Sequence, residues 1–388
     1  MNRSIAFLVF FSIVLGIYFL VNLYIYWRGL QALPTGSALR PWYQWGFWVV
    51  AGMFILGRTL EKVSLGLASD VFVWAGSLWL AAMLYFFLLV VLIDMLRLIH
   101  HFIPFFPGWI TANMEKTRLF LLWGSLVLVG FVVLGGFINA RNPRVKTLEI
   151  HIPKKAEGIN TLQAVVMSDI HLGTLVGNRL FNRVAEKVKA LSPDIILLPG
   201  DILDEDLQPV LRQNIGNTLR QLRAPMGVFA VMGNHEHIGG ASKAVEYLES
   251  HGITMLQDSV VKIKNSFFLV GREDHDKARL GGNPRASLDS LMKLVDPDFP
   301  IILMDHQPFH LEESALLGVD LQLSGHTHHG QLWPLQLLTK ARYTISRGYG
   351  KFGDMHAYVS NGVGTWGPPV RVGNRPEILH LLIHFNEE

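Results

Sequence analysis

The chain has 388 residues, of which half are hydrophobic, no cysteine and a formal net charge of +3. The absence of cysteine excludes disulfides, thiolate metal sites and cysteine nucleophiles. Residues 1–140 carry a net charge of +4 and the remainder −1, so a basic face for nucleic acid is not indicated. Residues 1–140 also hold only 12 of the 65 charged side chains and 2 of the 16 histidines. We therefore predict a membrane region at 1–140, a linker and first strand at 141–160, and one soluble domain at 161–388.

Four apolar stretches lie in the first region, at about residues 5–27, 42–57, 71–93 and 119–138. The first, third and fourth are long enough to cross about 30 Å of hydrocarbon as helices. The second is shorter, but Trp42, Tyr43 and Trp45 flank it like an interfacial aromatic belt, so we count it as a span. The first is expected to be a retained helix, because its apolar core is too long for a signal peptide and no small-residue cleavage site follows it.

The orientation of these spans depends on their number. Four spans place the N-terminus and the soluble domain on the same side of the membrane, whereas three place them on opposite sides. Near the span ends, six basic residues lie on the N-terminal side and five on the other. These are Arg3, Arg58, Lys62, Arg141, Arg144 and Lys146 on the first side, and Arg28, Arg40, Arg97, Lys116 and Arg118 on the second. This count leaves the orientation open, and we favour a cytoplasmic soluble domain.

The soluble part alternates between short apolar runs and helical patterns. Near-alternating apolar residues from Val145 to Ile152 predict a half-buried strand. Five further runs, each ending at a polar residue, are Leu162–Met167, Ile195–Leu198, Val228–Met232, Ile301–Met304 and Leu321–Leu323. Helical spacing of apolar residues over 181–188 and 244–248 separates some of them. This pattern predicts an α/β fold with polar residues gathered at the C-terminal ends of buried strands.

Five polar fragments stand at these strand ends. In chain order they are Asp169-Ile170-His171, Gly200-Asp201, Gly233-Asn234-His235-Glu236, His306 and Gly325-His326-Thr327-His328. Each of the first two alone is a weak signal, because such short sequences are common in turns. The ordered combination is hard to explain by structure alone. Aspartate, asparagine and imidazole together suit Mn, Fe or Zn, whereas an all-oxygen set would indicate Mg or Ca. The fragments predict a hydrolytic centre with two divalent metal ions.

These fragments resemble the motifs of the calcineurin-like metallophosphoesterase superfamily over residues 160–388. The resemblance implies a four-layer αββα sandwich with the metal centre at its edge. The tail, with Gly362-Val363-Gly364-Thr365 and Arg375-Pro376-Glu377-Ile378, is similar to a bacterial phosphodiesterase subgroup whose members are often membrane-anchored. The four spans are not carried by this resemblance and rest on hydropathy alone. Together, the apolar stretches and the resemblance to the bacterial subgroup predict an integral protein of a bacterial inner membrane.

The resemblance also implies a role for each residue that matches the family motifs. One metal would be held by Asp169, His171 and His328, the other by Asn234, His306 and His326, with Asp201 bridging them. A shared carboxylate and hydroxide reduce the repulsion between two adjacent cations, and the hydroxide attacks phosphorus. His235, oriented by Asp204, would act as the general acid. Apart from the resemblance, the guanidinium of Arg371, between Pro369 and Gly373, is a candidate for bidentate binding of the substrate phosphate, with an exposed surface arginine as the equal alternative. His329 stands where the subgroup usually has glycine; it either touches the site or faces solvent, and we expect the second.

Departures from the wider family pattern narrow the substrate. Glu205 and Asp206 follow Asp204 where protein Ser/Thr phosphatases carry arginine, which argues against a phosphoprotein. The apolar segment Leu332–Phe352 predicts either a hydrophobic lip for an acyl or prenyl chain or a lobe packed on the core. We expect a phosphodiester or pyrophosphate substrate, with a lipid-linked one favoured; the resemblance implies UDP-2,3-diacylglucosamine as one possibility and a broad range of diesters as another. The alternatives are a phosphomonoesterase and a catalytically vestigial membrane sensor or scaffold.

Overall fold

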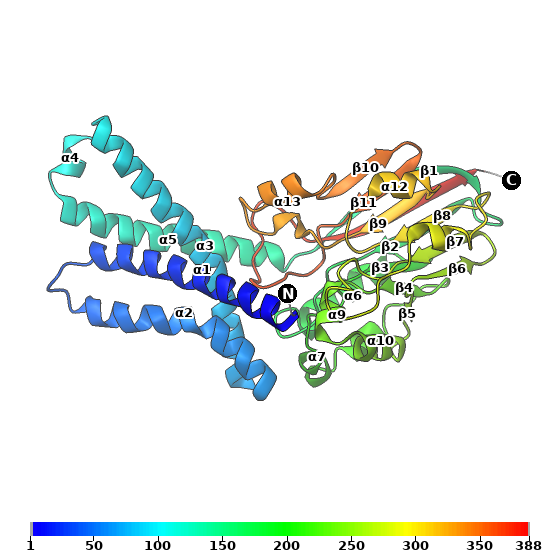
Figure 1. The fold of residues 1–388 in the computed structure, drawn as a ribbon, viewed down its shortest axis with the longest axis horizontal. Helices are drawn as coiled ribbons and strands as arrows, with labels where there is room; N and C mark the ends of the chain where they lie inside the picture. Colours follow the sequence, from blue (N-terminus) through cyan, green and yellow to red (C-terminus); the bar gives the residue numbers. More distant parts are fainter. Residues whose placement is uncertain (1–2, 387–388) are drawn as a thin grey trace. The chain divides into compact units, whose positions relative to one another are not determined.

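The computed structural model describes the backbone of residues 3–386 and their side chains, except those of residues 3–7 and 10. The ends of the two predicted regions, residues 1–2 and 387–388, lie outside this range. The chain divides into two compact units, Met1–Gly135 and Gly136–Glu388 (Figure 1).

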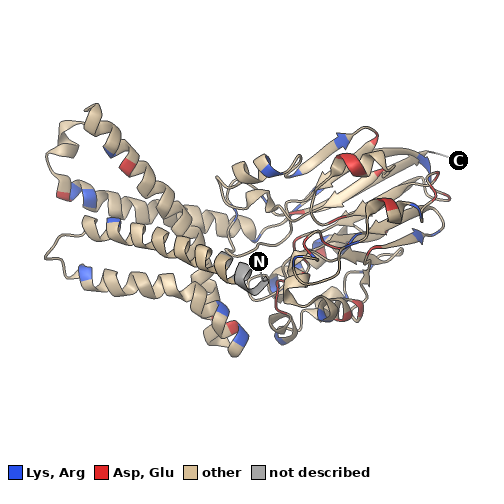
Figure 2. Cartoon of the chain, in the orientation of Figure 1, with Lys and Arg blue, Asp and Glu red and all other residues tan. Residues whose placement is uncertain are grey.

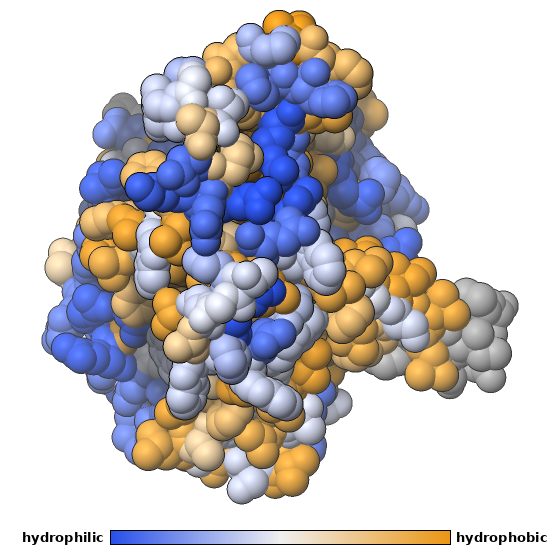
Figure 3. All heavy atoms as spheres, turned by 90° about the vertical axis from the view of Figure 1, so that its left-hand side faces the viewer, coloured by the Kyte–Doolittle hydropathy of each residue, from blue (hydrophilic) through white to orange (hydrophobic). Residues whose placement is uncertain are grey.

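The first unit is helical. Its helices are α1 (Arg3–Ala32), α2 (Leu39–Val63), α3 (Leu67–Phe102), the short α4 (Gly108–Thr111) and α5 (Met114–Ala140), whose last turn belongs to the second unit. Charged residues are sparse along these helices and lie mostly near their ends (Figure 2). Figure 3 draws both units from the left-hand side of Figure 1 and shows patches of hydrophobic residues beside a band of hydrophilic ones. This distribution fits helices surrounded by lipid, with charges held near the membrane surfaces.

Three described helical segments are long and apolar enough to cross a membrane: Phe11–Ala32, Leu67–Phe102 and Met114–Ala140. The second predicted stretch forms α2, but this helix is not among them, so the predicted number of four is not reached by length and composition. α2 nevertheless packs antiparallel along α3. A Cβ at Gly57 would lie 2.6 Å from the backbone of Val73, and one at Gly76 would lie 2.3 Å from that of Phe54. Glycine at both positions therefore allows backbone contact, as in many membrane helix pairs.

The second unit contains two six-stranded mixed sheets (Figure 1). The first has the order β1-β12-β2-β3-β4-β5 and the second β10-β11-β9-β8-β7-β6. The first-sheet strands are β1 (Arg144–Lys155), β2 (Thr161–Val166), β3 (Ile195–Pro199), β4 (Val228–Val231), β5 (Thr254–Met255) and β12 (Glu377–Asn386). The second-sheet strands are β6 (Ser259–Ile263), β7 (Phe267–Gly271), β8 (Ile301–Met304), β9 (Leu321–Ser324), β10 (Gly348–Phe352) and β11 (Met355–Val359). Strands β2 to β5 are parallel neighbours, as are β7, β8, β9 and β11.

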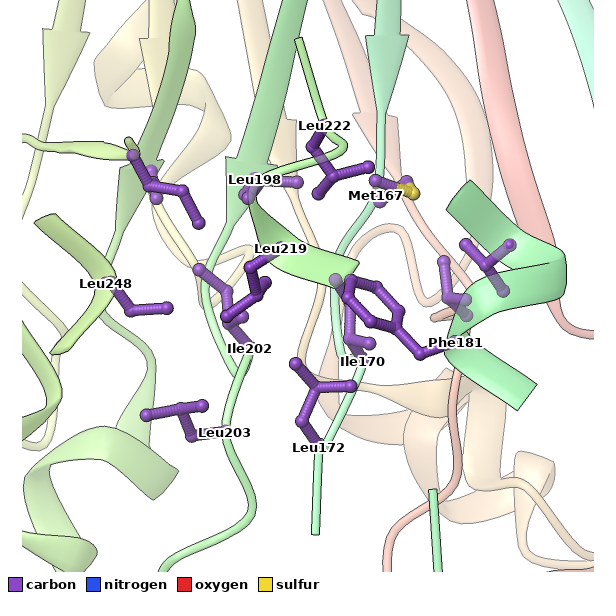
Figure 4. Close-up of a cluster of buried hydrophobic side chains, with 14 of the residues drawn as sticks. Met167, Ile170, Leu172, Phe181, Leu198, Ile202, Leu203, Leu219, Leu222 and Leu248 are labelled. Carbon is purple, nitrogen blue, oxygen red and sulfur yellow. The ribbon is translucent and has the colours of Figure 1, made fainter. Parts of the chain in front are cut away.

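Three buried apolar clusters separate the layers of this unit. One joins the first sheet to α6 (Asn178–Ala190), α8 (Gly216–Leu219) and α10 (Ala241–Glu249). Figure 4 shows part of it, with Phe181, Leu219 and Leu248 from these helices. The second cluster lies between the sheets, and the third joins the second sheet to α11 (Leu288–Met292) and α12 (Leu311–Leu316). The predicted αββα sandwich is therefore confirmed.

The strands expected to carry the polar motifs form within one residue of the predicted runs; they are β2, β3, β4, β8 and β9. Each is covered by helices on one face and by the other sheet on the second, which explains the continuous apolar sequences of β3, β4 and β8. Glutamine interrupts the apolar sequence of the other two strands, at Gln163 in β2 and Gln322 in β9. The helical patterns over 181–188 and 244–248 form α6 and α10. The remaining elements are α7 (Gln208–Arg212), α9 (Asn234–Gly239), the 3-10 turn η1 (His328–Gly330) and α13 (Gln336–Arg342).

Candidate metal centre

The polar motifs all follow the carboxyl ends of parallel strands. Asp169 and His171 follow β2, Asp201 follows β3, and Asn234 begins the helix after β4. In the second sheet, His306 follows β8, and His326 and His328 follow β9. Since parallel strands end at a common edge of their sheet, these loops converge as the sequence predicted.

The first group of converging side chains consists of Asp169, His171 and His328. One ligand atom from each lies within 4.8 Å of the other two, and all three residues are buried. His171 Nε2 is 2.9 Å from His328 Nε2, which is 3.4 Å from Asp169 Oδ1. Two imidazole nitrogens and a carboxylate oxygen directed at one point form a typical metal-binding arrangement.

The second group consists of Asp201, His306 and His326, again with ligand atoms within 4.8 Å of one another. Asn234 joins it, because its Oδ1 lies 2.9 Å from His326 Nδ1. Asp201 Oδ2 is 3.1 Å from His306 Nε2 and 3.8 Å from His171 Nε2, so this carboxylate lies between the two groups. The structure thus brings together all seven predicted metal ligands.

The hydrogen-bond partners of the two ring nitrogens of His306 indicate whether this arrangement suits metal ions. His306 Nδ1 lies 2.8 Å from the carbonyl oxygen of Pro199, which directs the Nε2 atom toward the cluster. Among the described residues that Nε2 is buried without a hydrogen-bond partner. Burial alone would lower the pKa of His306, but the carboxylate of Asp201 raises it well above its usual range. His306 Nε2 and Asp201 Oδ2 thus face each other as donor atoms for a shared cation, and the residues fit a divalent metal ion.

The protonation of the other imidazoles agrees with metal binding, which requires neutral histidine. Burial lowers the pKa of His171 to about 3 and that of His326 to about 4. Burial would raise the pKa of Asp201, but the imidazoles of His306 and His235 hold it well below its usual range. The site therefore offers neutral nitrogen ligands around an ionised carboxylate.

Five of the predicted ligands have a left-handed backbone. The φ angles of Asp169, His171, Asp201, His326 and His328 lie between 43° and 69°. Such conformations cost about 1–3 kcal/mol each for residues other than glycine, and they concentrate at functional sites. Their own side chains help to hold them. Asp169 Oδ1 accepts a hydrogen bond from the backbone of His326 (2.7 Å), and Asp201 Oδ1 accepts one from the backbone of His235 (3.0 Å).

Glu236 is a structural residue of the site, and the sequence analysis gave this residue no role. Its carboxylate is fully buried and accepts hydrogen bonds from the backbone N–H groups of Asp201 (3.1 Å), Leu203 (2.8 Å) and Gly233 (2.8 Å). It therefore ties the loop after β3 to the loop after β4. The signal was present in the sequence, because a glutamate three residues after a helix N-cap is the spacing of a capping box.

His235 and Asp204 lie beside the first metal-binding group. His235 Nδ1 is 3.3 Å from Asp204 Oδ1, and His171 lies within the same cluster of donor atoms. The indole of Trp366, which is largely exposed, meets the His235 ring edge-on at 5.9 Å. Burial alone would lower the pKa of His235, but the carboxylates of Asp201 and Asp204 raise it to about 9. The two neighbouring carboxylates thus favour the protonated imidazole.

Arg371 is placed behind the metal centre and is only 1% exposed. Its guanidinium donates to the carbonyl oxygens of Gly362 and Gly364 and to Asn374 Oδ1. One Nη2 lies 3.1 Å from His328 Nδ1. This geometry leaves little of the side chain accessible to a substrate phosphate, so the predicted contact gains no support. Arg371 instead positions the ring of His328.

The last turn of α5 supports the same loop. The side-chain amide of Asn139 donates to the carbonyl oxygens of Arg371 (2.9 Å) and Asn374 (2.7 Å), and the backbone of Arg371 donates to Gly136 (3.0 Å). No feature of the sequence pattern marked Asn139 or Asn374.

The expectation that His329 faces solvent is wrong. It is 3% exposed, and its Nδ1 lies 2.9 Å from Ser346 Oγ.

Comparison with known proteins agrees with this geometry. The family model described as calcineurin-like phosphoesterase matches residues 162–330. An uncharacterized metallophosphoesterase of Helicobacter pylori is 32% identical over 66% of this chain and 68% of its own length. A transmembrane protein with metallophosphoesterase domain of Bos taurus is 31% identical over 71% of this chain and 66% of its own, just under two thirds. An uncharacterized metallophosphoesterase of Campylobacter jejuni is 27% identical over 97% of this chain and 98% of its own, an alignment that includes the helical unit.

Proposed function

Because the chain belongs to the calcineurin-like phosphoesterase family, we propose that it is a membrane-bound enzyme that uses two divalent metal ions to hydrolyse a phosphodiester or pyrophosphate bond. Family membership supports the hydrolysis of a phosphoric ester with divalent metals. One observation supports the two-metal reading most directly, namely that Asp201 lies between two groups of buried donor atoms. The apolar helices and the transmembrane relative support a membrane protein.

The proposed mechanism assigns each side chain a task. Two ions held by the seven ligands would supply Lewis-acid catalysis and a nucleophilic hydroxide. Asp201 presents Oδ2 to the two metal-binding groups, while its Oδ1 accepts a hydrogen bond from the backbone of His235 and holds the carboxylate in place. His235 donates a proton to the leaving oxygen, and Asp204 orients its ring. Glu236 and Arg371 hold the loops and the His328 ring in place.

The proposed activity is tested on the full chain purified in a neutral detergent. After the metals are stripped with a chelator, we expect no hydrolysis of bis(p-nitrophenyl) phosphate, and Mn should restore it. Hydrolysis of p-nitrophenyl phosphate should be slower. A preference for this monoester would favour the phosphomonoesterase alternative. Two bound metal ions per folded chain without turnover of either compound would favour the vestigial sensor, or restrict catalysis to lipid substrates.

The segment after the last metal ligands carries an exposed apolar surface. Trp333, Leu337 and Leu338 are 53%, 62% and 67% exposed, and α13 contains no buried residue. The C-terminal part of the segment is different, because β10 pairs with β11 at the edge of the second sheet. Exposed apolar clusters of this kind mark interaction sites. We propose that Trp333, Leu337 and Leu338 form a lip that accepts the acyl or prenyl chain of a lipid-linked substrate.

Substituting Leu337 with aspartate tests this lip. Burying a leucine against a lipid chain contributes about 1.5–3 kcal/mol, so Leu337→Asp should lower kcat/KM for a long-chain lipid diester by at least about tenfold. Turnover of a soluble diester should stay unchanged. Leu316→Asp is the matched control, because Leu316 is 88% exposed on α12. Equal losses on the two substrates, or an equal effect in the control, would contradict the lip.

A further inference from the structure

The helical unit contains a cavity that the proposed catalysis does not use. It has a volume of about 510 Å³ and is lined by residues of α1, α2, α3, α4 and α5. This volume falls in the range of ligand pockets, about 300–1,000 Å³. Its lining is mainly apolar and includes Ile25, Phe47, Trp79, Phe86 and Leu122. The shape and chemistry of this part suit an aliphatic chain.

The lining also includes charged residues, and these share one end of the bundle. Arg28 lies near the end of α1, Asp94 and Arg97 near the end of α3, and Arg118 near the start of α5. The end of α1, the end of α3 and the start of α5 are neighbours because Arg28 pairs with Asp94 and α4 connects α3 to α5. Figure 2 shows charged residues gathered at the end of the unit that carries α4. The cavity is therefore amphipathic.

The positive charge at this end exceeds the negative charge. Asp94 is the single acidic residue of the described lining, and it pairs with both Arg28 (2.5 Å) and Arg97 (3.5 Å). Arg118 forms no hydrogen bond or ion pair with any residue that the structure describes. Arg28 Nε is buried and likewise lacks an acceptor among the described residues. Arg118 is exposed, so only the buried Nε of Arg28 carries the cost of an unsatisfied donor. The excess of positive charge beside an apolar membrane cavity favours an anionic ligand.

We propose that this cavity binds one anionic phospholipid. The head-group phosphate lies at Arg28, Arg97 and Arg118, whose guanidinium groups bind phosphate in bidentate fashion, and one acyl chain follows the apolar lining. A soluble anion would leave the apolar wall empty, and a zwitterionic lipid would bring its own ammonium cation beside three arginines that share one carboxylate, Asp94. Arg118 lies near the first residue of α5, whereas the metal ligands follow the last residue of this helix along the chain. The cavity residues all belong to the first unit and the proposed metal ligands to the second, so the proposal does not depend on the catalytic function.

Native mass spectrometry of the full chain in a neutral detergent tests the proposal, with dioleoyl phosphatidylglycerol and dioleoyl phosphatidylcholine as probes. We expect one tightly held phosphatidylglycerol per chain and at least a tenfold weaker binding of phosphatidylcholine. Arg118→Gln should weaken phosphatidylglycerol binding by about tenfold and leave the melting temperature unchanged, because Arg118 has no described partner to lose. Ser125→Phe, which fills the apolar part, should weaken both lipids.

Lys116→Gln is the matched control, since Lys116 is exposed in the same turn of α5 but does not line the cavity. Binding should survive in this variant. Equal retention of the two lipids, a graded series of bound copies with no preferred first one, or the same loss in Lys116→Gln and Arg118→Gln would overturn the proposal. Each of these results would identify ordinary boundary lipid or a general surface charge effect.

Discussion

Replacing Asp201 with asparagine is expected to leave the chain with fewer than two metal ions and to lower turnover by on the order of a thousandfold. The carboxylate stands between the two groups of ligands, so its charge serves both cations. Metal stabilisation of the transition state is worth several kcal/mol, and each 1.36 kcal/mol corresponds to a tenfold change in rate. Asparagine keeps the shape of the side chain and can still accept the hydrogen bond from the backbone of His235.

Elemental analysis of metals per chain, together with initial rates on a phosphodiester, checks this result on the full chain. Asp298→Asn is the control, because this aspartate is exposed in the turn before β8 and lies outside the metal-binding groups. It should bind two ions and keep its activity. Two ions and full turnover in Asp201→Asn would remove Asp201 from its proposed bridging position. A loss of metal in a chain that remains folded would support it, and the melting temperature should then match that of the metal-stripped native chain.

The parts of the fold that the sequence predicted share one physical cause. β3, β4 and β8 are buried along their whole length, so their apolar runs are continuous and end abruptly where the loops with polar ligands begin. α6 was recognisable because Phe181, Val184 and Val188 repeat at helical spacing on its buried face. By contrast, β6 and β10 lie at sheet edges with mixed exposure, and no run marked them.

The support behind the ligands was less accessible from the sequence, because it depends on contacts between distant residues. Asn139 hydrogen-bonds to a loop more than 230 residues away, and Arg371 reaches His328 across 43 residues. An arginine in a loop between prolines and glycines indicates a surface position, and only the carbonyl oxygens of Gly362 and Gly364 explain its burial.

The second apolar stretch shows a related limit. Its sequence predicts a helix correctly, but its composition does not decide whether α2 spans a membrane.

His235→Ala is expected to retain both metal ions and to lose about 10²–10⁴-fold in turnover, the usual contribution of general acid catalysis. His235 is not one of the seven proposed ligands, so its removal leaves every donor atom of the two groups in place. His237→Ala is the matched control, because that imidazole binds Glu273 at 3.0 Å and lies outside the metal-binding groups. Rates and metal content of both variants, measured at neutral pH on the same phosphodiester, check the prediction.

The identity of the leaving group separates proton donation from a merely structural role for His235. p-Nitrophenolate leaves without needing a proton, whereas an alkoxide leaves poorly unless it is protonated in the transition state. If His235 is the donor, His235→Ala should therefore lose much more activity on an alkyl ester than on a p-nitrophenyl ester. Asp204→Asn should show the same pattern to a smaller extent, since Asp204 only orients the ring and raises its pKa. Equal losses on both esters would mean that His235 acts through the shape of the site rather than through its proton.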